Sequence, residues 1–362
     1  MKLGIIGFPA CGKTSLFNSV TGAAQPVGQY SATPGVHLAT VRVHDPRMYR
    51  LKEIYKPKSF VLAHMECEDV SGLIDGKGEQ KEISGEVLGN VRQVDAIVHV
   101  VRAFESSAVP HVLDSVDPKR DMAETVSELL FADLAQCEQR VKKLRNQVLK
   151  PTKTQEHDKK ELVVLERIYA LLENGQPVSK FEASNEDEKK MVAAFQFLTV
   201  KPVLTVFNVG ESDLGSGGKA AQLEKDHPGS ISLCAKLEME LAQLSDAERE
   251  MFLTELGIKE LAAPRLISQV YTALGLLSFF TVGEDEVRAW TIHRGNNAQQ
   301  AAGKIHSDLA KGFIRAEVFT YADLEAAGGD ERVMKAQHHL RLEGKEYSVK
   351  DGDILNIRAN TR

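Results

Sequence analysis

One short segment near the start of the chain, Gly7-Phe-Pro-Ala-Cys-Gly-Lys-Thr14, constrains the fold more than any other feature. It fits the pattern G-x-x-x-x-G-K-[ST] and lies between an apolar run at 2–7, which predicts a buried strand, and a predicted helix from Lys13. In that setting, backbone N–H groups and the positive end of the helix dipole surround an anion. The segment therefore predicts a phosphate-binding loop, with Gly7 and Gly12 permitting its tight backbone.

Five residues, two in the loop and three outside it, are expected to supply the chemistry of this site. Lys13 is expected to reach the β- and γ-phosphates, and the Thr14 hydroxyl is expected to bind Mg²⁺. A second magnesium ligand should end another strand, and Asp69 stands there in Asp-Val-Ser-Gly72. The N–H of Gly72 is expected to sense the γ-phosphate. Thr33, in QYSATPG, is a candidate third magnesium ligand, with an ordinary loop threonine as the alternative.

The residue after D-x-x-G bears on the rate of hydrolysis. Many GTPases place a glutamine there, and its amide orients the attacking water. This chain has Leu73, which has no hydrogen-bonding group. We therefore expect slow intrinsic hydrolysis unless another group reaches the water.

Recognition of the base is expected after the strand candidate at 201–208, where the chain reads Asn208-Val209-Gly210-Glu211. GTPases usually carry N-K-x-D at this point, and the aspartate pairs with guanine. The longer Glu211 should misplace that pairing, at a cost of ~1–3 kcal/mol. Guanine preference should therefore weaken, while the Asn208 amide matches the edge that adenine presents. The backbone of Cys234 and Ala235, after a short strand at 230–234, can also contact the base.

Apolar runs separated by helical segments predict an α/β fold with a mainly parallel sheet and helices on both faces. The strand candidates are 2–7, 36–43, 59–66, 95–102, 201–208 and 230–234.

Between 120 and 198 the pattern changes to long helices. From Met122 to Val148 apolar residues recur at steps of three or four, close to a heptad seam. We interpret this region as an antiparallel helical arm, with core helices of one large domain as the alternative. The predicted domains are a nucleotide-binding domain at 1–119 and 199–277, the arm at 120–198, and an α+β domain at 278–362.

Composition excludes several classes of protein. The chain carries 45 lysine and arginine residues against 51 acids, a net charge of −6, so general attraction to DNA or anionic membranes is not encoded. No stretch approaches the ~20 apolar residues of a membrane span. The four cysteines are widely separated, which favours free thiols. A cytoplasmic protein without DNA or membrane partners is expected.

Segments distributed over nearly the whole chain resemble the YchF/Obg-like ATPase family. They are GFPACGKTS (7–15), DVSGL (69–73), VDPKRDM (116–122), NVGE (208–211), CAKLEMELAQL (234–244), EVRAWTIHRG (286–295), KGFIRAEV (311–318) and LRLEGKEYSVKDGD (340–353). The resemblance implies a P-loop NTPase G domain interrupted by a coiled-coil arm and followed by a β-grasp TGS domain. It also implies ATP binding and hydrolysis, with GTP often accepted, and association with the ribosome or its RNA.

The same resemblance implies residue roles. Phosphate contacts fall on Ala10 through Ser15, which includes Cys11, and magnesium contacts on Thr14 and Thr33. Adenine contacts fall on Asn208 and Val209. His111 matches a family histidine suspected of orienting the attacking water, with a surface loop histidine as the alternative.

Two features of the loop depart from or qualify this assignment. Relatives typically have asparagine at the position of Ala10, where it helps to hold an activating K⁺, so K⁺ dependence is doubtful here. Cys11 is either a small packing residue or an oxidation-sensitive thiol at a helix N-terminus.

Three functions fit the sequence. The leading one is a magnesium-dependent ATPase switch that acts on the translation apparatus. The second is a conventional GTP-specific GTPase. The third, which Ala10 and Leu73 motivate, is a nucleotide-gated binding protein with negligible turnover.

Overall fold

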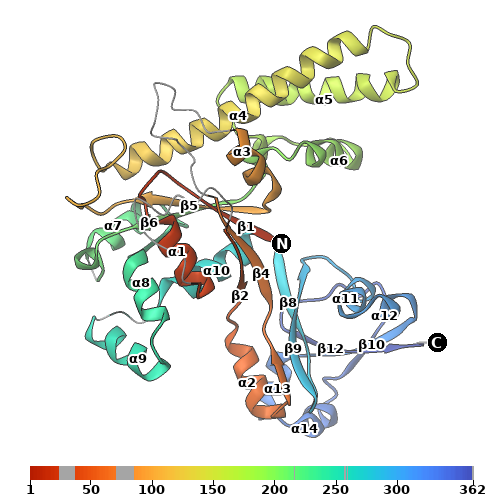
Figure 1. The fold of residues 1–362 in the computed structure, drawn as a ribbon. Helices are drawn as coiled ribbons and strands as arrows, with labels where there is room; N and C mark the ends of the chain where they lie inside the picture. The colour runs from red at the N-terminus through yellow and green to blue at the C-terminus, as the bar shows by residue number, and fades with distance from the viewer. Residues whose placement is uncertain (24–36, 71–84, 216, 257, 259, 361–362) are drawn as a thin grey trace. The chain divides into compact units, whose positions relative to one another are not determined.

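The computed structural model describes the whole chain except residues 24–36, 71–84, 216, 257, 259, 361 and 362. The described chain divides into two compact units (Figure 1). The first unit comprises Met1–Ala39 and Glu66–Ala263, and the second comprises Thr40–Met65 and Pro264–Arg362. None of the described helices is both long enough and apolar enough to cross a membrane.

The first sheet has the strand order β2-β4-β1-β5-β6-β7. Its strands are β1 (Lys2–Ile6), β2 (His37–Arg42), β4 (His64–Asp69), β5 (Ala96–Arg102), β6 (Val203–Asn208) and β7 (Ile231–Leu233). β1 pairs in parallel with β4 and β5, and the parallel pairing continues from β5 to β6 and from β6 to β7. Every residue of β5 is buried, as expected for a strand covered on both faces. The predicted mainly parallel sheet is confirmed.

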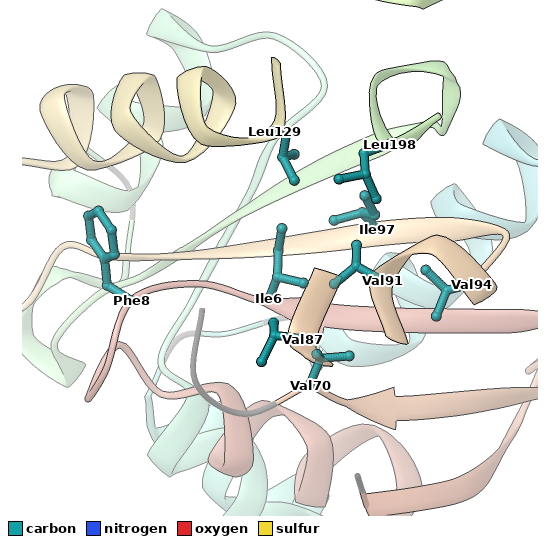
Figure 2. Close-up of a cluster of buried hydrophobic side chains, with 9 residues drawn as sticks. All are labelled: Ile6, Phe8, Val70, Val87, Val91, Val94, Ile97, Leu129 and Leu198. Carbon is teal, nitrogen blue, oxygen red and sulfur yellow. The ribbon is translucent and has the colours of Figure 1, made fainter. Parts of the chain in front are cut away.

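Most helices of the first unit connect these strands, and the last two follow β7. They are α1 (Lys13–Thr21), α3 (Gly85–Gln93), α4 (Pro118–Gln147), α5 (Gln155–Glu173), α6 (Glu186–Phe195), α7 (Lys219–Asp226), α8 (Ala235–Ala242) and α9 (Asp246–Glu255). One apolar cluster fixes α3 and α4 to a face of the sheet (Figure 2). Its buried members are Ile6, Phe8, Val70, Val87, Val91, Val94, Ile97, Leu129 and Leu198. Burying each such aliphatic side chain contributes ~1.5–3 kcal/mol, so the cluster holds the carboxyl edge of β1 firmly.

The arm is a hairpin of α4 and α5 (Figure 1), and the buried face of α4 changes along its length. Cys137, Val141 and Leu144 pack with α5, as the heptad pattern predicts. Nearer the N-terminus, the predicted seam residue Val126 is 45% exposed, and the buried line includes Asp121 instead. The prediction is wrong there because this half of α4 packs on the sheet and α3 rather than on a partner helix.

Asp133, in the middle of α4, anchors the root of the arm. Its side chain is fully buried and accepts hydrogen bonds from the backbone N–H groups of Leu198 (2.9 Å) and Thr199 (2.8 Å). The Thr199 hydroxyl also donates to it at 2.9 Å, and Arg92 Nη1 of α3 lies 3.1 Å away. A buried carboxylate is tolerable only with such partners. Asp133 therefore ties α4 to α3 and to the segment that leads into β6.

The second sheet has the order β11-β10-β12-β8-β9-β3. Its strands are β3 (Ser59–Val61), β8 (Leu276–Thr281), β9 (Glu286–His293), β10 (Phe313–Thr320), β11 (Arg341–Glu343) and β12 (Asp353–Ala359). Its helices are α2 (Pro46–Tyr55), α11 (Ala298–Ile305), α12 (Ser307–Lys311), α13 (Tyr321–Ala326) and α14 (Glu331–Ala336), while α10 (Ala262–Ala273) leads into it. Alanines of α11 pack with Leu277 and Phe279 of β8 in the core of this unit.

Residues 40–65 belong to this second unit, which the sequence analysis did not predict. β3 pairs in parallel with β9, with Ser59 opposite Glu286, and Arg47 Nη1 of α2 lies 2.7 Å from Asp351 Oδ2. The predicted single strand at 59–66 is therefore two strands, β3 in the second sheet and β4 in the first. The limits predicted for the three domains remain predictions.

Candidate nucleotide-binding site

The predicted phosphate loop lies at the carboxyl edge of the first sheet. It follows β1, and parallel pairing places the end of β4 beside it, with Ile5 opposite Asp69. Asn208 ends β6 at the same edge, opposite Arg102 of β5. Ligands of open parallel sheets bind at this edge.

The loop backbone requires glycine at two positions. Gly12 has φ of 103°, and a Cβ there would lie 2.1 Å from Asn208 Nδ2. Gly7 has φ of 150°, and its Cβ would lie 2.3 Å from the Val100 carbonyl oxygen. Any larger residue must move the backbone or the brace beside it. Ala10 adopts φ of 59°, a left-handed conformation that costs an L-residue about 1 kcal/mol or more.

The start of α1 suits an anion. Its N-cap is Gly12, no side chain caps it, and its first turn contains no acidic residue. Lys13 is buried, and its Nζ donates to the carbonyl oxygens of Gly7 (3.0 Å) and Phe8 (2.9 Å). The ammonium thus lies over the loop, where phosphate oxygens can replace these carbonyl acceptors.

Thr14 and Asp69 meet as a candidate magnesium site. Thr14 Oγ1 donates to Asp69 Oδ2 at 2.9 Å. Asp69 is 1% exposed, and its Oδ1 is buried with no hydrogen-bond partner in the described part of the chain. A hydroxyl and an unsatisfied carboxylate oxygen are hard ligands of the kind Mg²⁺ prefers, so the residues fit the metal. Thr33, Gly72 and Leu73 lie outside the described residues, and their roles remain predictions.

Asn208 braces the loop, which the sequence analysis missed. Its Nδ2 donates to the Cys11 carbonyl oxygen at 2.8 Å, and its Oδ1 accepts from the Ala235 N–H at 2.9 Å. The side chain therefore joins the phosphate loop to the start of α8. One N–H and one lone pair of the amide remain for a base, and the predicted adenine contact stays a prediction. The spacing N-x-x-E carries no signal for this bracing.

The remaining residues of the base edge differ in exposure. Val209 is 1% exposed and packs in an apolar cluster with Phe207, so only its backbone can contact a base. Glu211 begins a short 3₁₀ turn (Glu211–Asp213) and is exposed. Lys236 Nζ lies 3.7 Å from Glu211 Oε1. Cys234 is the N-cap of α8, which places its backbone beside Ala235 at this edge.

Cys11 is 1% exposed within the loop. Burial raises the pKa of its thiol, against the opposing attraction of the Lys13 ammonium. The thiol is therefore neutral near pH 7, as the packing interpretation of Cys11 expects. Ser15, the last residue of the predicted loop, is also buried.

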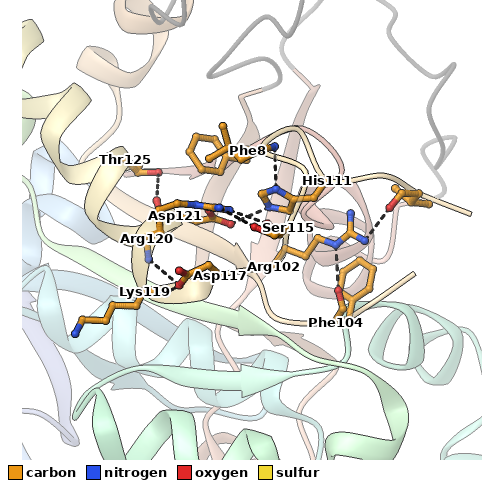
Figure 3. Close-up of polar contacts among 12 residues, drawn as sticks. Phe8, Arg102, Phe104, His111, Ser115, Asp117, Lys119, Arg120, Asp121 and Thr125 are labelled. Atoms are coloured by element: carbon orange, nitrogen blue, oxygen red, sulfur yellow. Dashed lines mark hydrogen bonds and ion pairs between the residues drawn. The ribbon is translucent and has the colours of Figure 1, made fainter. Parts of the chain in front are cut away.

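His111 is 8% exposed rather than on the surface. Its ring meets the Phe8 ring edge to face, with centroids 6.4 Å apart. Its Nδ1 accepts from the Leu113 N–H at 3.1 Å, and its Nε2 lies 2.8 Å from Asp121 Oδ2 (Figure 3). Nδ1 is thus occupied by a hydrogen bond, whereas Nε2 makes a close contact with Asp121 that lacks hydrogen-bond geometry. The predicted role of His111 in water orientation remains a prediction.

The sequence analysis also missed two buried side chains of β5. Burial, and then the nearby Lys13 charge, lower the pKa of His99 to about 4. Arg102 donates to the carbonyl oxygens of Phe104 (3.1 Å) and Val109 (2.8 Å), which shapes the loop that leads to His111. The apolar pattern of this strand does not indicate that a buried histidine or a loop-binding arginine lies within it.

Known proteins are similar to this chain along nearly its whole length. A family model described as "50S ribosome-binding GTPase" matches residues 2–166, and one described as "YchF-GTPase_C: Protein of unknown function" matches residues 276–360. A Bacillus subtilis protein named "Ribosome-binding ATPase YchF" is 39% identical over 369 residues, covering 99% of both chains. The chain belongs to the YchF family.

Two other YchF proteins are similar to this chain over nearly its whole length. The "Ribosome-binding ATPase YchF" of Escherichia coli O157:H7 is 38% identical, with 99% of both chains covered. The solved Schizosaccharomyces pombe structure, titled "YchF GTPase", superimposes with a TM-score of 0.85 at 34% identity, covering 99% of this chain and 97% of that one. The predicted family and α/β fold class are confirmed, including a second sheet in the C-terminal part.

Proposed function

We propose that this YchF protein is a nucleotide switch that binds and slowly hydrolyses ATP with Mg²⁺ and acts at the ribosome. The observation that carries the proposal is the Thr14–Asp69 contact, with its unsatisfied carboxylate oxygen, beside a loop that only glycine can form. That combination provides an anion cradle and a divalent metal site at adjacent positions.

The phosphate end of the proposed site has the following roles. The backbone of Gly7 and of residues 10–15 surrounds the phosphates, and Lys13 neutralises the β- and γ-phosphates. Thr14, Asp69 and Thr33 hold Mg²⁺, which supplies charge neutralisation of the phosphate chain. Gly72 senses the γ-phosphate, and Leu73 leaves intrinsic hydrolysis slow.

The base end supports ATP with GTP as a second substrate. Glu211 is longer than the aspartate of conventional GTPases, and this is the residue that disfavours the alternative of a GTP-specific enzyme. Relatives carry both descriptions, since the B. subtilis protein is named an ATPase and the S. pombe structure a GTPase. Asn208 and the backbone of Val209, Cys234 and Ala235 line the place of the base.

The ribosome is proposed as partner because the bacterial relatives are named ribosome-binding ATPases. A net charge of −6 makes nonspecific RNA attraction weak, so a particular surface must be used. We assign nucleotide binding to the part of 1–119 and 199–277 that lies in the first unit, and partner contact to the arm (120–198) and the C-terminal domain (278–362). A cytoplasmic location follows from that partner.

Potassium is not expected to activate hydrolysis. The methyl group of Ala10 offers no ligand atom, whereas the asparagine expected in relatives does.

The test is competitive titration of ATP and GTP against a labelled analogue, followed by phosphate release with and without ribosomes. We expect comparable or tighter binding of ATP and slow release that requires Mg²⁺. Asp69→Asn should abolish the magnesium-dependent phosphate release, whereas Asp95→Asn, before β5 and away from the loop, should leave it intact. GTP binding more than about tenfold tighter would favour the conventional GTPase. Release that stays at background with ribosomes and K⁺ would favour the binding protein without turnover.

A further inference from the structure

The loop between β5 and α4, which carries His111, is held at both ends by arginines (Figure 3). Arg102 donates to the backbone carbonyls of Phe104 and Val109 at its start. At its end, Arg120 donates to the Ser115 carbonyl oxygen at 2.7 Å and to the Ser115 hydroxyl at 3.0 Å. Such clamping fixes the path of a loop that would otherwise be free to vary.

The His111 ring is fixed in addition by its own two nitrogens. Because Nδ1 accepts the Leu113 N–H, the ring proton of a neutral imidazole must be on Nε2. Nε2 lies 2.8 Å from Asp121 Oδ2, and both side chains are 3% exposed. The two atoms form a close buried contact without hydrogen-bond geometry, and a small rotation of the ring or the carboxylate would align them. The second carboxylate oxygen, Oδ1, accepts from Arg120 Nε (3.0 Å) and Nη2 (2.8 Å). The carboxylate, the imidazole and the guanidinium thus form one connected group.

This group gives a role to the segment VDPKRDM (116–122), which neither the phosphate loop nor the arm seam explains. A buried carboxylate costs free energy that an apolar residue on the same face of α4 would avoid. Asp117, four residues earlier, already caps the helix by accepting from the N–H groups of Lys119 and Arg120. Asp121 is therefore not needed as a cap, and its contact with His111 is the function left.

We propose that Asp121 is a positioning residue that fixes His111 as the tautomer with its lone pair on Nδ1. The inference rests on the proposed hydrolysis of ATP and on the prediction that His111 orients the attacking water. In the described conformation the Leu113 N–H occupies that lone pair. When the residue 111–113 turn opens, Nδ1 becomes the acceptor for a water O–H, while Asp121 keeps the Nε2 proton in place.

The position of Asp121 links two parts of the first unit. It lies in the first turn of α4, so the start of the arm sets the orientation of the imidazole. The other side of the ring contacts Phe8 in the phosphate loop. A shift of the first turn of α4 therefore reaches the phosphate loop through a single buried histidine.

The decisive variant is Asp121→Asn, which keeps size and burial but can present either an oxygen or an NH₂ group to Nε2. It no longer fixes one tautomer, so we expect kcat for ATP hydrolysis to fall at least about tenfold with the Kd for ATP unchanged within twofold. Asp121→Glu should recover part of kcat. The matched control is Glu124→Gln, which changes an exposed carboxylate on the same helix and should leave kcat unchanged.

A readout independent of turnover is the ¹⁵N shift of the His111 ring nitrogens, assigned by the signals that His111→Gln removes. We expect a single Nε2–H tautomer in the unaltered protein and a mixture in Asp121→Asn. Unaltered kcat and tautomer in Asp121→Asn, or an increased kcat, would overturn the proposal. If the unaltered protein binds ATP but never releases phosphate, the proposed function fails, and the nitrogen shifts still decide whether Asp121 fixes the ring.

Discussion

The two ends of the candidate site differ in the groups that form them: mainly backbone at the phosphate end and exposed side chains at the base end. The phosphate end is backbone: glycines with no space for a Cβ, a helix start without a side-chain cap, and a buried Asn208 brace. The base end presents an exposed Glu211 with Lys236 3.7 Å away. A surface side chain can be exchanged without disturbing the fold, whereas the loop cannot. The comparison teaches that triphosphate binding is fixed by steric requirements, while the choice of base depends on one replaceable carboxylate.

The largest expected effect breaks the phosphate end. Gly12→Ala places a Cβ 2.1 Å from Asn208 Nδ2 at a φ of 103°. We expect affinity for ATP and GTP to fall at least ~1,000-fold, or ~4 kcal/mol, by calorimetry. Gly22→Ala is the control, because Gly22 also has positive φ (67°) but has nothing within 4 Å of its Cβ position. It should cost about 1 kcal/mol of stability and leave affinity intact. Equal losses in both variants would contradict the steric argument.

Acid should destabilise the buried side of the site. His99 is neutral in the folded state, with its pKa lowered to about 4 from 6.5, so the unfolded chain binds the extra proton between these values. Stability is therefore complete above about pH 6.5 and falls as the pH approaches 4, by up to ~1.4 kcal/mol per pH unit and about 3 kcal/mol in total. Urea unfolding at several pH values measures the slope.

Two variants isolate this contribution from that of the carboxylates. His99→Gln should flatten the slope between pH 6.5 and 4, whereas His157→Gln, on the exposed surface of α5, should leave it in place. An identical slope in His99→Gln and the unaltered protein would show that other groups carry the acid sensitivity.

Asn208→Ala tests whether this side chain contributes to the phosphate end or to the base end of the site. If its amide braces the loop, Asn208→Ala should weaken ATP and GTP binding equally, by about 2 kcal/mol for two lost buried hydrogen bonds. The ratio of the two affinities should not move, which competitive titration measures directly. Asn146→Ala, exposed on the arm, provides the control. A change in the ratio would instead assign Asn208 to the base.

The smallest effect sharpens the base end. Glu211→Asp restores the carboxylate length of conventional GTPases, so we expect preference to shift toward GTP by up to about tenfold, or ~1 kcal/mol. Total affinity for the triphosphate should stay constant. Glu240→Asp is the matched control, since Glu240 also approaches Lys236, at 3.9 Å. A shift of the same size in both would implicate Lys236 rather than Glu211.

Local patterns predicted much of this molecule. The strand, glycine and lysine spacing at 2–14 fixes a loop because its geometry depends on adjacent residues. The Thr14–Asp69 contact was predictable because parallel strands end at one edge. The Asn208 brace was not, because its partners, Cys11 and Ala235, are backbone atoms that carry no residue signal.

Two further features required knowledge of tertiary contacts. Heptad spacing counts apolar residues, so it misplaced the buried face of α4 where Asp121 and Asp133 are buried with polar partners. The transfer of residues 40–65 to the second unit depends on pairing between β3 and β9, which lie far apart in the chain. Neither could follow from local propensity.

The anchorage at Asp133 gives the arm a mechanical property. Fourteen residues of α4 lie beyond it, a rod of about 21 Å at 1.5 Å per residue. A tilt of about 5° at this pivot moves the far end of the helix by roughly 2 Å. Small movements of α3, or of the strand that follows Thr199, therefore become larger displacements at the tip of the arm. Conversely, a force applied to the tip exerts a larger force on the contacts of Asp133.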